Sequence, residues 1–349
     1  MYQVLSEEGV PVEGFSLKPS MLLSMYRDMV LSRVLDRWLM RLQRMGRVGI
    51  HAPSEGQEGT YVGSAYALEK EDWIFPLYRE LPVYVARKVP LEQLLNRFLS
   101  NSGDPLKGHD FAVFGSREHR IVAAPVAVSL HIPTAVGFAM ALKKRKAGHV
   151  VVNYFGDGAT SRGDFHEALN FAGVFKPPIV FFCVNNHYSI SLPVSRQTAS
   201  NTLAEKAVAY GLEGLRVDGN DVAACYVVGG RAVEKARRGE GPTLVEALTY
   251  RIGPHTTADD PARYRSVEEV ESWKGRDPLK RVKAFLMNEG FWSEKEDADM
   301  WREYDKTVAE AVEESSRMPP LKPTSILEDV YWEPPWNLRE AAEELTQLA

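Results

Sequence analysis

Two short apolar segments on either side of one helix-length segment constrain the fold of this chain most strongly. Residues 149–155 and 179–184 are largely apolar, and residues 160–172 between them carry apolar side chains at helical spacing. This pattern predicts a strand, a helix and a second strand. Strands that are apolar on both faces are typical of a parallel sheet with helices packed on both sides.

The same alternation continues towards the C-terminus. Residues 202–210 and 221–238 have the pattern of helices, and residues 215–217 and 243–250 have the pattern of strands. Upstream, residues 21–43 have the apolar spacing of a long amphipathic helix. We therefore expect an α/β fold, in which a doubly wound, mainly parallel sheet has helices on both faces and helical extensions at both ends of the chain.

Three regions follow from this organisation. We expect an N-terminal helical arm over residues 1–50, an α/β domain over residues 51–275, and a C-terminal helical region and arm over residues 276–349. Within the α/β domain, residues 253–265 are polar and show no periodicity, which predicts a long functional loop. The Pro-Pro-Trp sequence at 334–336 indicates that the C-terminal arm lies on a surface.

Composition and charge argue against nucleic acid and membranes as partners. The chain has 349 residues, a formal net charge of -5 and a pI near 6.0, so it offers no broad positive field to a polyanion. It has no apolar run of the roughly 18 residues that span a bilayer, and its start does not resemble a secretion signal. Cys183 and Cys225 form no C-x-x-C pair, which favours a reducing compartment over a disulfide or zinc site. We expect a cytoplasmic protein.

Polar clusters follow both strands of the central pattern. Gly156-Asp157-Gly158-Ala159 comes directly after the first strand, and Asn185-Asn186 follows the second. The carboxyl ends of parallel strands share one edge of the sheet, where open α/β sheets bind ligands. The glycines allow the backbone to approach an anion, and the helix expected from Thr160 would direct free N–H groups at it. A carboxylate and an amide oxygen suit Mg2+ or Ca2+ bound to a diphosphate.

Two other phosphate-binding motifs do not fit these residues. Gly158 and Gly163 have the spacing of a P-loop, but Asp164 stands where that motif has a lysine. Gly156 and Gly158 lack the third glycine of the dinucleotide-binding fingerprint, which argues against an NAD site. Taken alone, the Gly-Asp-Gly cluster could equally be a simple turn and the Asn-Asn pair a strand terminator.

The pairing of the two clusters removes most of this ambiguity. Gly156-Asp157-Gly158 is followed after 26 residues by Asn185-Asn186, as in the thiamin-diphosphate motif. The segment FGDGATSRGDFHEALNFAGVFKPPIVFFCVNNHYSIS closely resembles the alpha subunits of the thiamin-diphosphate-dependent E1 component of 2-oxoacid dehydrogenase complexes. The similarity extends through further segments of the chain, at residues 26–49, 55–68, 75–80, 216–222 and 249–273.

The resemblance implies a metal site and a cofactor site. A metal ion would be held by Asp157, Asn186 and the main-chain carbonyl of Tyr188, with the diphosphate completing an octahedron. Gly158 and Ala159 would present backbone N–H groups to the diphosphate. The cofactors implied in this way are thiamin diphosphate and Mg2+.

The family resemblance implies three further residues of the cofactor site. Tyr78 and Arg79 match a Tyr-Arg pair that contacts the diphosphate, although Arg79 taken alone reads as a surface ion-pair partner. His255 matches a loop histidine beside the diphosphate and the reacting centre, although a loop histidine taken alone is usually a plain surface residue. The resemblance makes His255 the catalytic candidate, which would stabilise charge or move a proton while the acyl group passes to lipoamide.

The chain departs from the family pattern at several positions. Val184 stands where many relatives have Arg or Glu, and Leu77 stands where some have a polar residue. Residues 123–133 align ambiguously with a stretch that binds potassium and lies under the cofactor's pyrimidine ring in some members, so a potassium site and His131 are left unassigned. Thr256 occupies the place of a hydroxyl that is phosphorylated in some relatives, and the sequence does not say whether it is modified.

The expected chemistry needs a second chain. Thiamin enzymes built from one chain carry two α/β domains, one for the diphosphate and one for the glutamate that activates the cofactor, and this chain has room for only the first. The resemblance implies an E1 beta subunit in an α2β2 heterotetramer. That assembly would work with a lipoyl-bearing E2 acyltransferase and an E3 flavin dehydrogenase on a small 2-oxo acid.

The expected activity is oxidative decarboxylation of a 2-oxo acid with transfer of the acyl group to E2-bound lipoamide. Branched-chain 2-oxo acids are favoured, because GPHTTADD, RSVEEVESW and DVYWEPPWNLR look more like that subgroup than like pyruvate enzymes. The alpha subunits of pyruvate and acetoin dehydrogenases share the cofactor motifs and stay as alternatives. A non-catalytic scaffold or regulatory subunit is an alternative of a different class, and four retained residues argue against it: Asp157, Asn186, Arg79 and His255.

Overall fold

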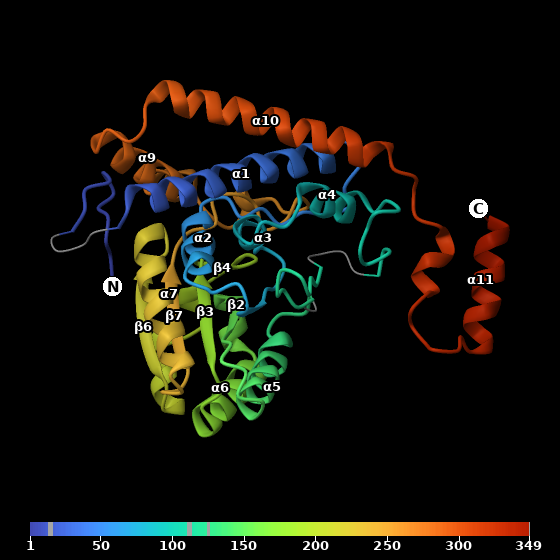
Figure 1. Cartoon of the computed structure of the whole chain (residues 1–349), viewed down its shortest axis with the longest axis horizontal. Helices are drawn as coiled ribbons and strands as arrows, with labels where there is room; N and C mark the ends of the chain where they lie inside the picture. The colour runs from blue at the N-terminus through green and yellow to red at the C-terminus, as the bar shows by residue number, and fades with distance from the viewer. Residues whose placement is uncertain (13–16, 110–113, 124–125, 349) are drawn as a thin grey trace.

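Five parallel strands form the central sheet of the computed structural model (Figure 1). The structure describes residues 1–12, 17–109, 114–123 and 126–348. The strands are β1 (Trp73–Phe75), β2 (Val151–Gly156), β3 (Ile179–Asn185), β6 (Glu213–Asp218) and β7 (Thr243–Leu248). Their order across the sheet is β1-β2-β3-β7-β6, and each neighbouring pair is parallel. All five strands lie between residues 51 and 275, where the α/β domain was expected.

Helices cover both faces of this sheet. Two pack on each side: α2 (Glu58–Tyr66) and α7 (Val222–Arg237) on one face, and α5 (His131–Lys144) and α6 (Gly163–Phe175) on the other. Tyr154 and Phe182 point to the first pair of helices, whereas Phe155 and Phe181 on the same strands point to the second. Both strands are therefore buried on both sides, which explains their continuous apolar sequences. The predicted doubly wound α/β fold is confirmed.

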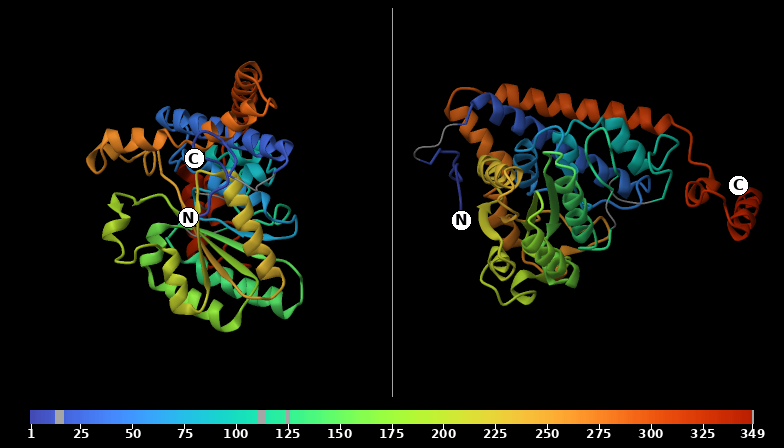
Figure 2. Two further views of the ribbon diagram at one scale, coloured as in Figure 1. Left: turned by 90° about the vertical axis from the view of Figure 1, so that its left-hand side faces the viewer. Right: turned by 60° about the horizontal axis from the view of Figure 1, so that its bottom comes forward.

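A further layer of helices packs over α2 on the side away from the sheet (Figures 1 and 2). It contains α1 (Pro19–Arg44), α3 (Leu81–Ala86), α4 (Leu91–Leu99), α9 (Pro278–Asn288) and α10 (Glu294–Arg317). Arg33 of α1 forms ion pairs with Glu58 of α2 and with Asp277 at the start of α9, so one buried guanidinium joins three helices. In the described part of the chain, no helix is both long and apolar enough to cross a membrane.

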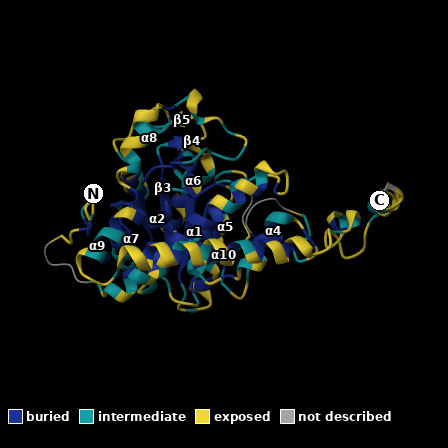
Figure 3. Cartoon of the chain, turned by 90° about the horizontal axis from the view of Figure 1, so that it is seen from above, coloured by how far each residue is buried: buried dark blue, intermediate teal, exposed yellow. Residues whose placement is uncertain are grey.

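The C-terminal arm extends away from the body of the molecule (Figures 1 and 3). It contains η5 (Pro323–Leu327) and α11 (Trp336–Leu348), which pack against each other. The amine of Lys107 lies 2.6 Å from the carboxylate of Asp329, so the first half of the arm rests on the loop after α4. Trp332, between η5 and α11, is 99% exposed. The helix α11 thus projects outward instead of lying on the sheet domain.

Short elements at the carboxyl edge of the sheet differ from the expected ones. The α-helix predicted from Thr160 begins only at Gly163, because a 3-10 turn, η1 (Asp157–Ser161), comes first. The hydroxyl of Thr160 donates to the carbonyl of Asp157 at 2.9 Å and closes this tighter turn. The segment predicted as a helix at 202–210 is likewise a 3-10 helix, η3 (Ala204–Tyr210). The remaining elements are β4 (Tyr188–Ser189), β5 (Leu192–Pro193), η2 (Val194–Arg196), η4 (Pro261–Arg263) and α8 (Val267–Lys274).

Candidate active site

A cavity lies where β2 and β3 end, at the carboxyl edge of the sheet. Its walls come from the segment after β1, from the ends of β2 and β3 and from the loop after β7. All eight residues predicted for the site line this one cavity: Tyr78, Arg79, Asp157, Gly158, Ala159, Asn186, Tyr188 and His255. The structure therefore brings the predicted residues together, and the role of each one stays a prediction.

The carboxylate of Asp157 and the amide of Asn186 occupy neighbouring strand ends. Asp157 is 1% exposed, and its Oδ2 atom accepts a hydrogen bond from Nε2 of Gln197 at 2.7 Å. Burial raises the pKa of the Asp157 carboxyl, while the Gln197 hydrogen bond and nearby groups including the Arg251 guanidinium act in the opposite direction. Asn186 is 6% exposed, and its Nδ2 atom donates to Oε1 of Gln57 at 2.9 Å. Both side chains are thus held in fixed orientations by a glutamine.

The carbonyl of Tyr188 is the third predicted metal ligand. It belongs to the β4–β5 hairpin, which returns the chain to the cavity after β3. Nη1 of Arg251 donates to this carbonyl at 3.2 Å, and Nη2 of Arg251 donates to the carbonyl of Ile190 at 2.6 Å. The Tyr188 side chain points away from the predicted ligand position, because its hydroxyl donates to Glu269 at 3.0 Å. A guanidinium beside the carbonyl means that a metal ion here also needs a bound anion to balance the charge.

The oxygen donors of the cavity fit a hard divalent cation. One carboxylate, one side-chain amide and one main-chain carbonyl are all oxygen ligands, which Mg2+ prefers to nitrogen or sulfur. Among the described residues there is no group of three or more His, Cys, Asp or Glu that could hold a metal without help. An ion in this cavity would therefore complete its coordination with oxygens of a ligand or of water, as expected for Mg2+ bound to a phosphate group.

Two buried guanidiniums, of Arg79 and Arg251, also line the cavity. Arg79 is 5% exposed and Arg251 is 0% exposed. Within the described residues, all hydrogen bonds of these two groups go to carbonyl, hydroxyl or imidazole atoms and none goes to a carboxylate. Burial, followed by the charge of Arg79, lowers the pKa of Arg251. Two buried cations without a carboxylate partner are the arrangement expected of an anion site.

His255 lies between these two guanidiniums. Its Nδ1 atom is 3.1 Å from Nη2 of Arg79 and 3.3 Å from Nη1 of Arg251. Its backbone N–H donates to Asp259 at 2.7 Å, and the hydroxyl of Tyr264 donates to the same carboxylate oxygen. Burial, followed by the charges of Arg79 and Arg251, lowers the pKa of His255 to about 3. The imidazole is therefore neutral, with Nδ1 as acceptor and the proton on Nε2.

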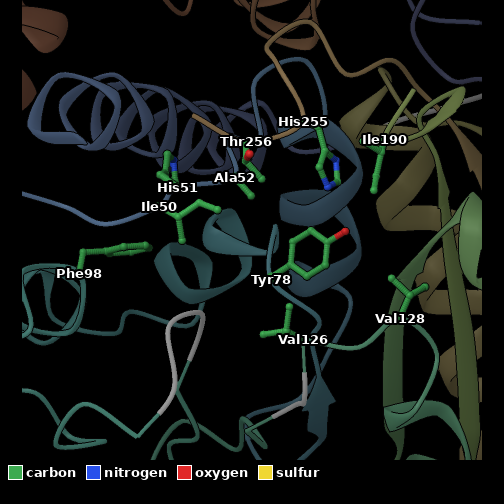
Figure 4. A pocket seen from close by; sticks show the side chains of 10 residues that line it. All are labelled: Ile50, His51, Ala52, Tyr78, Phe98, Val126, Val128, Ile190, His255 and Thr256. Atoms are coloured by element: carbon green, nitrogen blue, oxygen red, sulfur yellow. The ribbon is translucent and has the colours of Figure 1, made fainter. Parts of the chain in front are cut away.

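An apolar pocket adjoins the charged cavity and shares residues with it (Figure 4). His255 and Tyr78 lie in the common wall, with rings 6.1 Å apart in an edge-to-face arrangement. The rest of the pocket carries mainly aliphatic and aromatic side chains: Ile50, His51, Ala52, Phe98, Val126, Val128, Ile190 and Thr256. A ligand that filled both spaces would have a charged end at the strand ends and an apolar end in this pocket.

Comparison with known proteins identifies the family. The sequence profile described as "Dehydrogenase E1 component" matches residues 26–324, which is most of the chain. The chain belongs to the dehydrogenase E1 component family. Enzymes of this E1 family depend on thiamin diphosphate, so the family and the cofactor class expected from the sequence agree with this result.

Individual relatives of this E1 chain are alpha subunits. It is 48% identical over 275 residues to the 3-methyl-2-oxobutanoate dehydrogenase subunit alpha of Mycobacterium tuberculosis, covering 78% of this chain and 72% of the relative. It is 40% identical over 352 residues to the mitochondrial 2-oxoisovalerate dehydrogenase subunit alpha of Mus musculus, covering 99% and 80%. It is 39% identical over 350 residues to the pyruvate dehydrogenase E1 component subunit alpha of Bacillus subtilis, covering 99% and 92%. The expected function, an E1 alpha subunit of a 2-oxoacid dehydrogenase complex, is confirmed at this level.

Some residues of the E1 site were not found by sequence reasoning. Arg251 lies shortly after β7, within residues 249–273, but nothing in the sequence indicates that it points into the cavity. Gln57 and Gln197 contact the predicted metal ligands from segments 129 and 40 residues away in the chain. Glutamine has no sequence signature for such a role, so only the three-dimensional arrangement reveals it.

Proposed function

We propose that this chain binds the diphosphate of thiamin diphosphate together with Mg2+ in the cavity at the ends of β2 and β3. The observation that carries the proposal is the charge arrangement of the cavity. The predicted oxygen donors and two buried guanidiniums, of Arg79 and Arg251, line the same cavity, and neither guanidinium has a carboxylate partner among the described residues. A magnesium diphosphate matches both kinds of group, because the metal needs oxygen ligands and the anion needs positive charge.

The predicted site residues of the cavity have distinct roles in this proposal. Asp157, Asn186 and the carbonyl of Tyr188 hold the metal ion, as the resemblance implied. The backbone N–H groups of Gly158 and Ala159, in the first turn of η1, donate to the diphosphate. Because η1 precedes α6, these N–H groups come from the 3-10 turn and not from the first turn of the α-helix.

The two guanidiniums orient the anion and the catalytic candidate. Arg79 donates to the diphosphate while its other bonds, to the carbonyls of Pro53 and His255, keep it in place. Tyr78 lies beside His255 and contributes to the wall between the charged cavity and the apolar pocket. When bound, thiamin diphosphate supplies a nucleophilic carbon and an electron sink for decarboxylation. The Nε2–H group of His255 then donates to developing negative charge, or moves a proton, during transfer of the acyl group to lipoamide.

The proposal includes partner proteins. We propose that an E1 beta subunit supplies the activating glutamate and that two copies of each chain form an α2β2 heterotetramer. The heterotetramer passes acyl groups to the lipoyl-bearing E2 acyltransferase, and the E3 flavin dehydrogenase reoxidises the lipoamide. Both cysteines, Cys183 and Cys225, are buried and free, which suits the reducing cytoplasm that we propose as the location.

For the substrate, we propose a branched-chain 2-oxo acid. The apolar pocket carries aliphatic side chains of Ile50, Val126, Val128 and Ile190, which suit a branched acyl group. The names of the relatives from Mycobacterium tuberculosis and Mus musculus point to branched-chain substrates of those proteins. The relative from Bacillus subtilis is named for pyruvate, which is the second candidate.

A substrate panel tests this proposal. The chain is mixed with an E1 beta subunit, and CO2 release is measured with pyruvate and with three branched-chain 2-oxo acids in the presence of thiamin diphosphate and Mg2+. We expect kcat/KM to be highest for a branched-chain acid. Higher kcat/KM for pyruvate would overturn the substrate assignment, and no turnover of any 2-oxo acid would overturn the enzymatic proposal itself.

A further inference from the structure

Gln197 fixes the orientation of the Asp157 carboxylate. It follows η2, and its Nε2 atom donates both to Oδ2 of Asp157 at 2.7 Å and to the carbonyl of Leu192 at 2.9 Å. The first bond holds one carboxylate oxygen, so Oδ1 is the oxygen left for an ion. The second bond ties the same amide to β5, whose partner strand β4 carries the carbonyl of Tyr188. One glutamine therefore influences two of the three proposed ligands.

Gln57 fixes the orientation of the Asn186 amide from the opposite side. It is the residue before α2, is 0% exposed, and accepts from Nδ2 of Asn186 through its Oε1 atom at 2.9 Å. An asparagine amide presents an oxygen on one side and an NH2 group on the other. Because Gln57 binds the NH2 group, the Oδ1 atom of Asn186 is directed the other way. The backbone N–H of Tyr188 donates to the Oδ1 atom at 3.3 Å, so the hydrogen bond to Gln57 is one of two that favour this amide orientation. Loss of the Gln57 acceptor would make it easier for the amide to rotate and present N–H groups to a cation, which repels them.

Both glutamines leave their second amide atom unsatisfied. Nε2 of Gln57 and Oε1 of Gln197 are buried and have no hydrogen-bond partner among the described residues. Buried polar atoms without a partner are uncommon in folded proteins because they cost stability. A leucine or methionine would fill the same space without this cost. Two such atoms, each next to a predicted metal ligand, indicate that these positions serve the site at the expense of stability.

We propose that Gln57 and Gln197 are positioning residues that set which oxygens of Asn186 and Asp157 face the metal ion. This inference rests on the proposed function, because it assumes that Mg2+ binds with thiamin diphosphate in this cavity. Gln57 acts only as an acceptor, towards Asn186, and Gln197 acts as a donor, towards Asp157. The two positions therefore have opposite chemical requirements.

Glutamate substitutions exploit this difference. In Gln57→Glu the side chain still has an oxygen for the NH2 group of Asn186, so the orientation is kept. In Gln197→Glu the donor is replaced by a second carboxylate against Asp157, so the orientation is lost. Gln57→Met and Gln197→Met remove each hydrogen bond while keeping a similar side-chain volume. Gln347→Glu, on the exposed face of α11, is the matched control for an added charge far from the site.

The measurement is metal binding by the reconstituted complex with the beta-type subunit, not activity. Dissociation constants for Mg2+ and for Ca2+ are determined by calorimetry at one fixed concentration of thiamin diphosphate, the same for every variant. We expect Gln197→Glu, Gln197→Met and Gln57→Met to weaken Mg2+ binding by about 10- to 100-fold, the range seen when the groups that orient metal ligands are removed. The Mg2+ dissociation constants of the Gln57→Glu and Gln347→Glu complexes should stay within about threefold of the wild-type value, because neither change removes a group that orients a metal ligand.

Metal selectivity separates positioning from general damage to the fold. Mg2+ requires near-ideal octahedral ligands, whereas Ca2+ accepts flexible geometry. Misoriented ligands should therefore reduce Mg2+ affinity more than Ca2+ affinity, and the effect should be larger for Gln197 because it also holds the hairpin. A loss of fold would weaken both ions alike, and the melting temperature of each assembled variant reports such a loss directly.

The outcomes are distinguishable. If the wild-type complex binds thiamin diphosphate equally well without Mg2+ or Ca2+, the proposed function is wrong. If the wild type needs the metal, but the assembled variants at Gln57 and Gln197 keep its affinity and its preference for Mg2+, the positioning roles are wrong. An equal loss of Mg2+ affinity in Gln57→Glu and Gln197→Glu would also overturn the inference, because the first position is proposed to need an acceptor and the second a donor.

Discussion

The Nδ1 atom of His255 lies 3.1 Å from the Nη2 atom of Arg79, so this histidine nitrogen accepts a hydrogen bond from a guanidinium. Arg251 approaches the same nitrogen at 3.3 Å. Since a guanidinium can only donate, Nδ1 carries no proton and the Nε2 atom does. The two arginines proposed to bind the diphosphate therefore also determine the tautomer and the charge of the catalytic candidate.

The lowered pKa of His255 predicts how stability depends on pH. In the unfolded chain the imidazole takes up a proton near its ordinary pKa of 6.5, but in the folded chain it does so only near pKa 3. Between these two pKa values the unfolded state binds more protons than the folded state. The contribution of neutral His255 to the free energy of unfolding is therefore fully present above about pH 6.5 and is lost as the pH falls towards about 3. His255→Gln should reduce the fall in the free energy of unfolding between about pH 7 and about pH 5. Urea titrations at both pH values measure the free energy of unfolding. If it falls by the same amount in His255→Gln as in the wild type, the lowered pKa assigned to His255 is contradicted.

His255 should separate chemistry from binding. It lies on a loop, while the proposed metal ligands lie at the strand ends, so His255→Ala should retain most of the cofactor affinity of the complex. Acyl transfer to a lipoyl domain should fall by about 10²- to 10⁴-fold, the usual effect of removing a group that transfers protons or stabilises charge. Decarboxylation with an artificial electron acceptor should fall less, because it bypasses acyl transfer. A wild-type rate of transfer to the lipoyl domain would make His255 a structural loop residue.

Gly158 should tolerate no side chain. A Cβ atom at this position would lie 2.3 Å from Oγ and 2.8 Å from Cβ of Ser189, and the second contact cannot be relieved by rotating the hydroxyl. We expect Gly158→Ala to displace η1 or the β4–β5 hairpin and to weaken thiamin diphosphate binding by the reconstituted complex. The double variant with Ser189→Gly should recover part of the affinity. If the Gly158→Ala complex binds thiamin diphosphate as tightly as the wild type, Ser189 does not exclude a side chain at position 158.

Gly137 provides the control for this substitution. It is an exposed helical glycine in α5, and a Cβ atom there meets nothing within 4 Å. Gly137→Ala should leave cofactor affinity unchanged and raise the free energy of unfolding by about 0.5–1 kcal/mol, because alanine favours the helix more than glycine does.

The isolated chain should be inactive. We expect no CO2 release from any 2-oxo acid by the pure alpha chain with thiamin diphosphate and Mg2+, because the proposed activating glutamate belongs to another subunit. Adding the beta-type chain should restore turnover, with a maximum at an equimolar ratio of the two chains. Robust CO2 release by the pure alpha chain would refute the two-chain proposal.

The sequence correctly predicted which residues lie together where a polar residue directly follows a buried strand. Asp157 and Asn186 could be placed together because both strands are recognisable as apolar runs, and parallel strands share their carboxyl edge. Family resemblance, not periodicity, supplied Arg79 and His255, which reach the cavity from irregular segments. The start of α6 was predicted wrongly, because the hydrogen bond that closes the 3-10 turn η1 leaves no periodic signal.

Residues that act through long-range contacts could not be predicted in this way. Gln197 reaches Asp157 only because η2 and the β4–β5 hairpin turn back over η1, and no local pattern encodes that path. Arg251 lies next to a buried strand end, where a positive charge is unexpected unless an anion binds there. Its role follows from its burial and from its hydrogen-bond partners, both of which require the folded structure.

The central claim, that the cavity at the ends of β2 and β3 holds the metal and the diphosphate, is tested most directly at Asp157. Thiamin diphosphate affinity is measured by calorimetry with and without Mg2+ for complexes that contain either the wild-type chain or Asp157→Ala. The wild type should bind the cofactor tightly only with Mg2+, and the variant should lose this Mg2+-dependent binding while keeping the wild-type melting temperature without cofactor. Undiminished, Mg2+-dependent affinity in the Asp157→Ala complex would contradict the account.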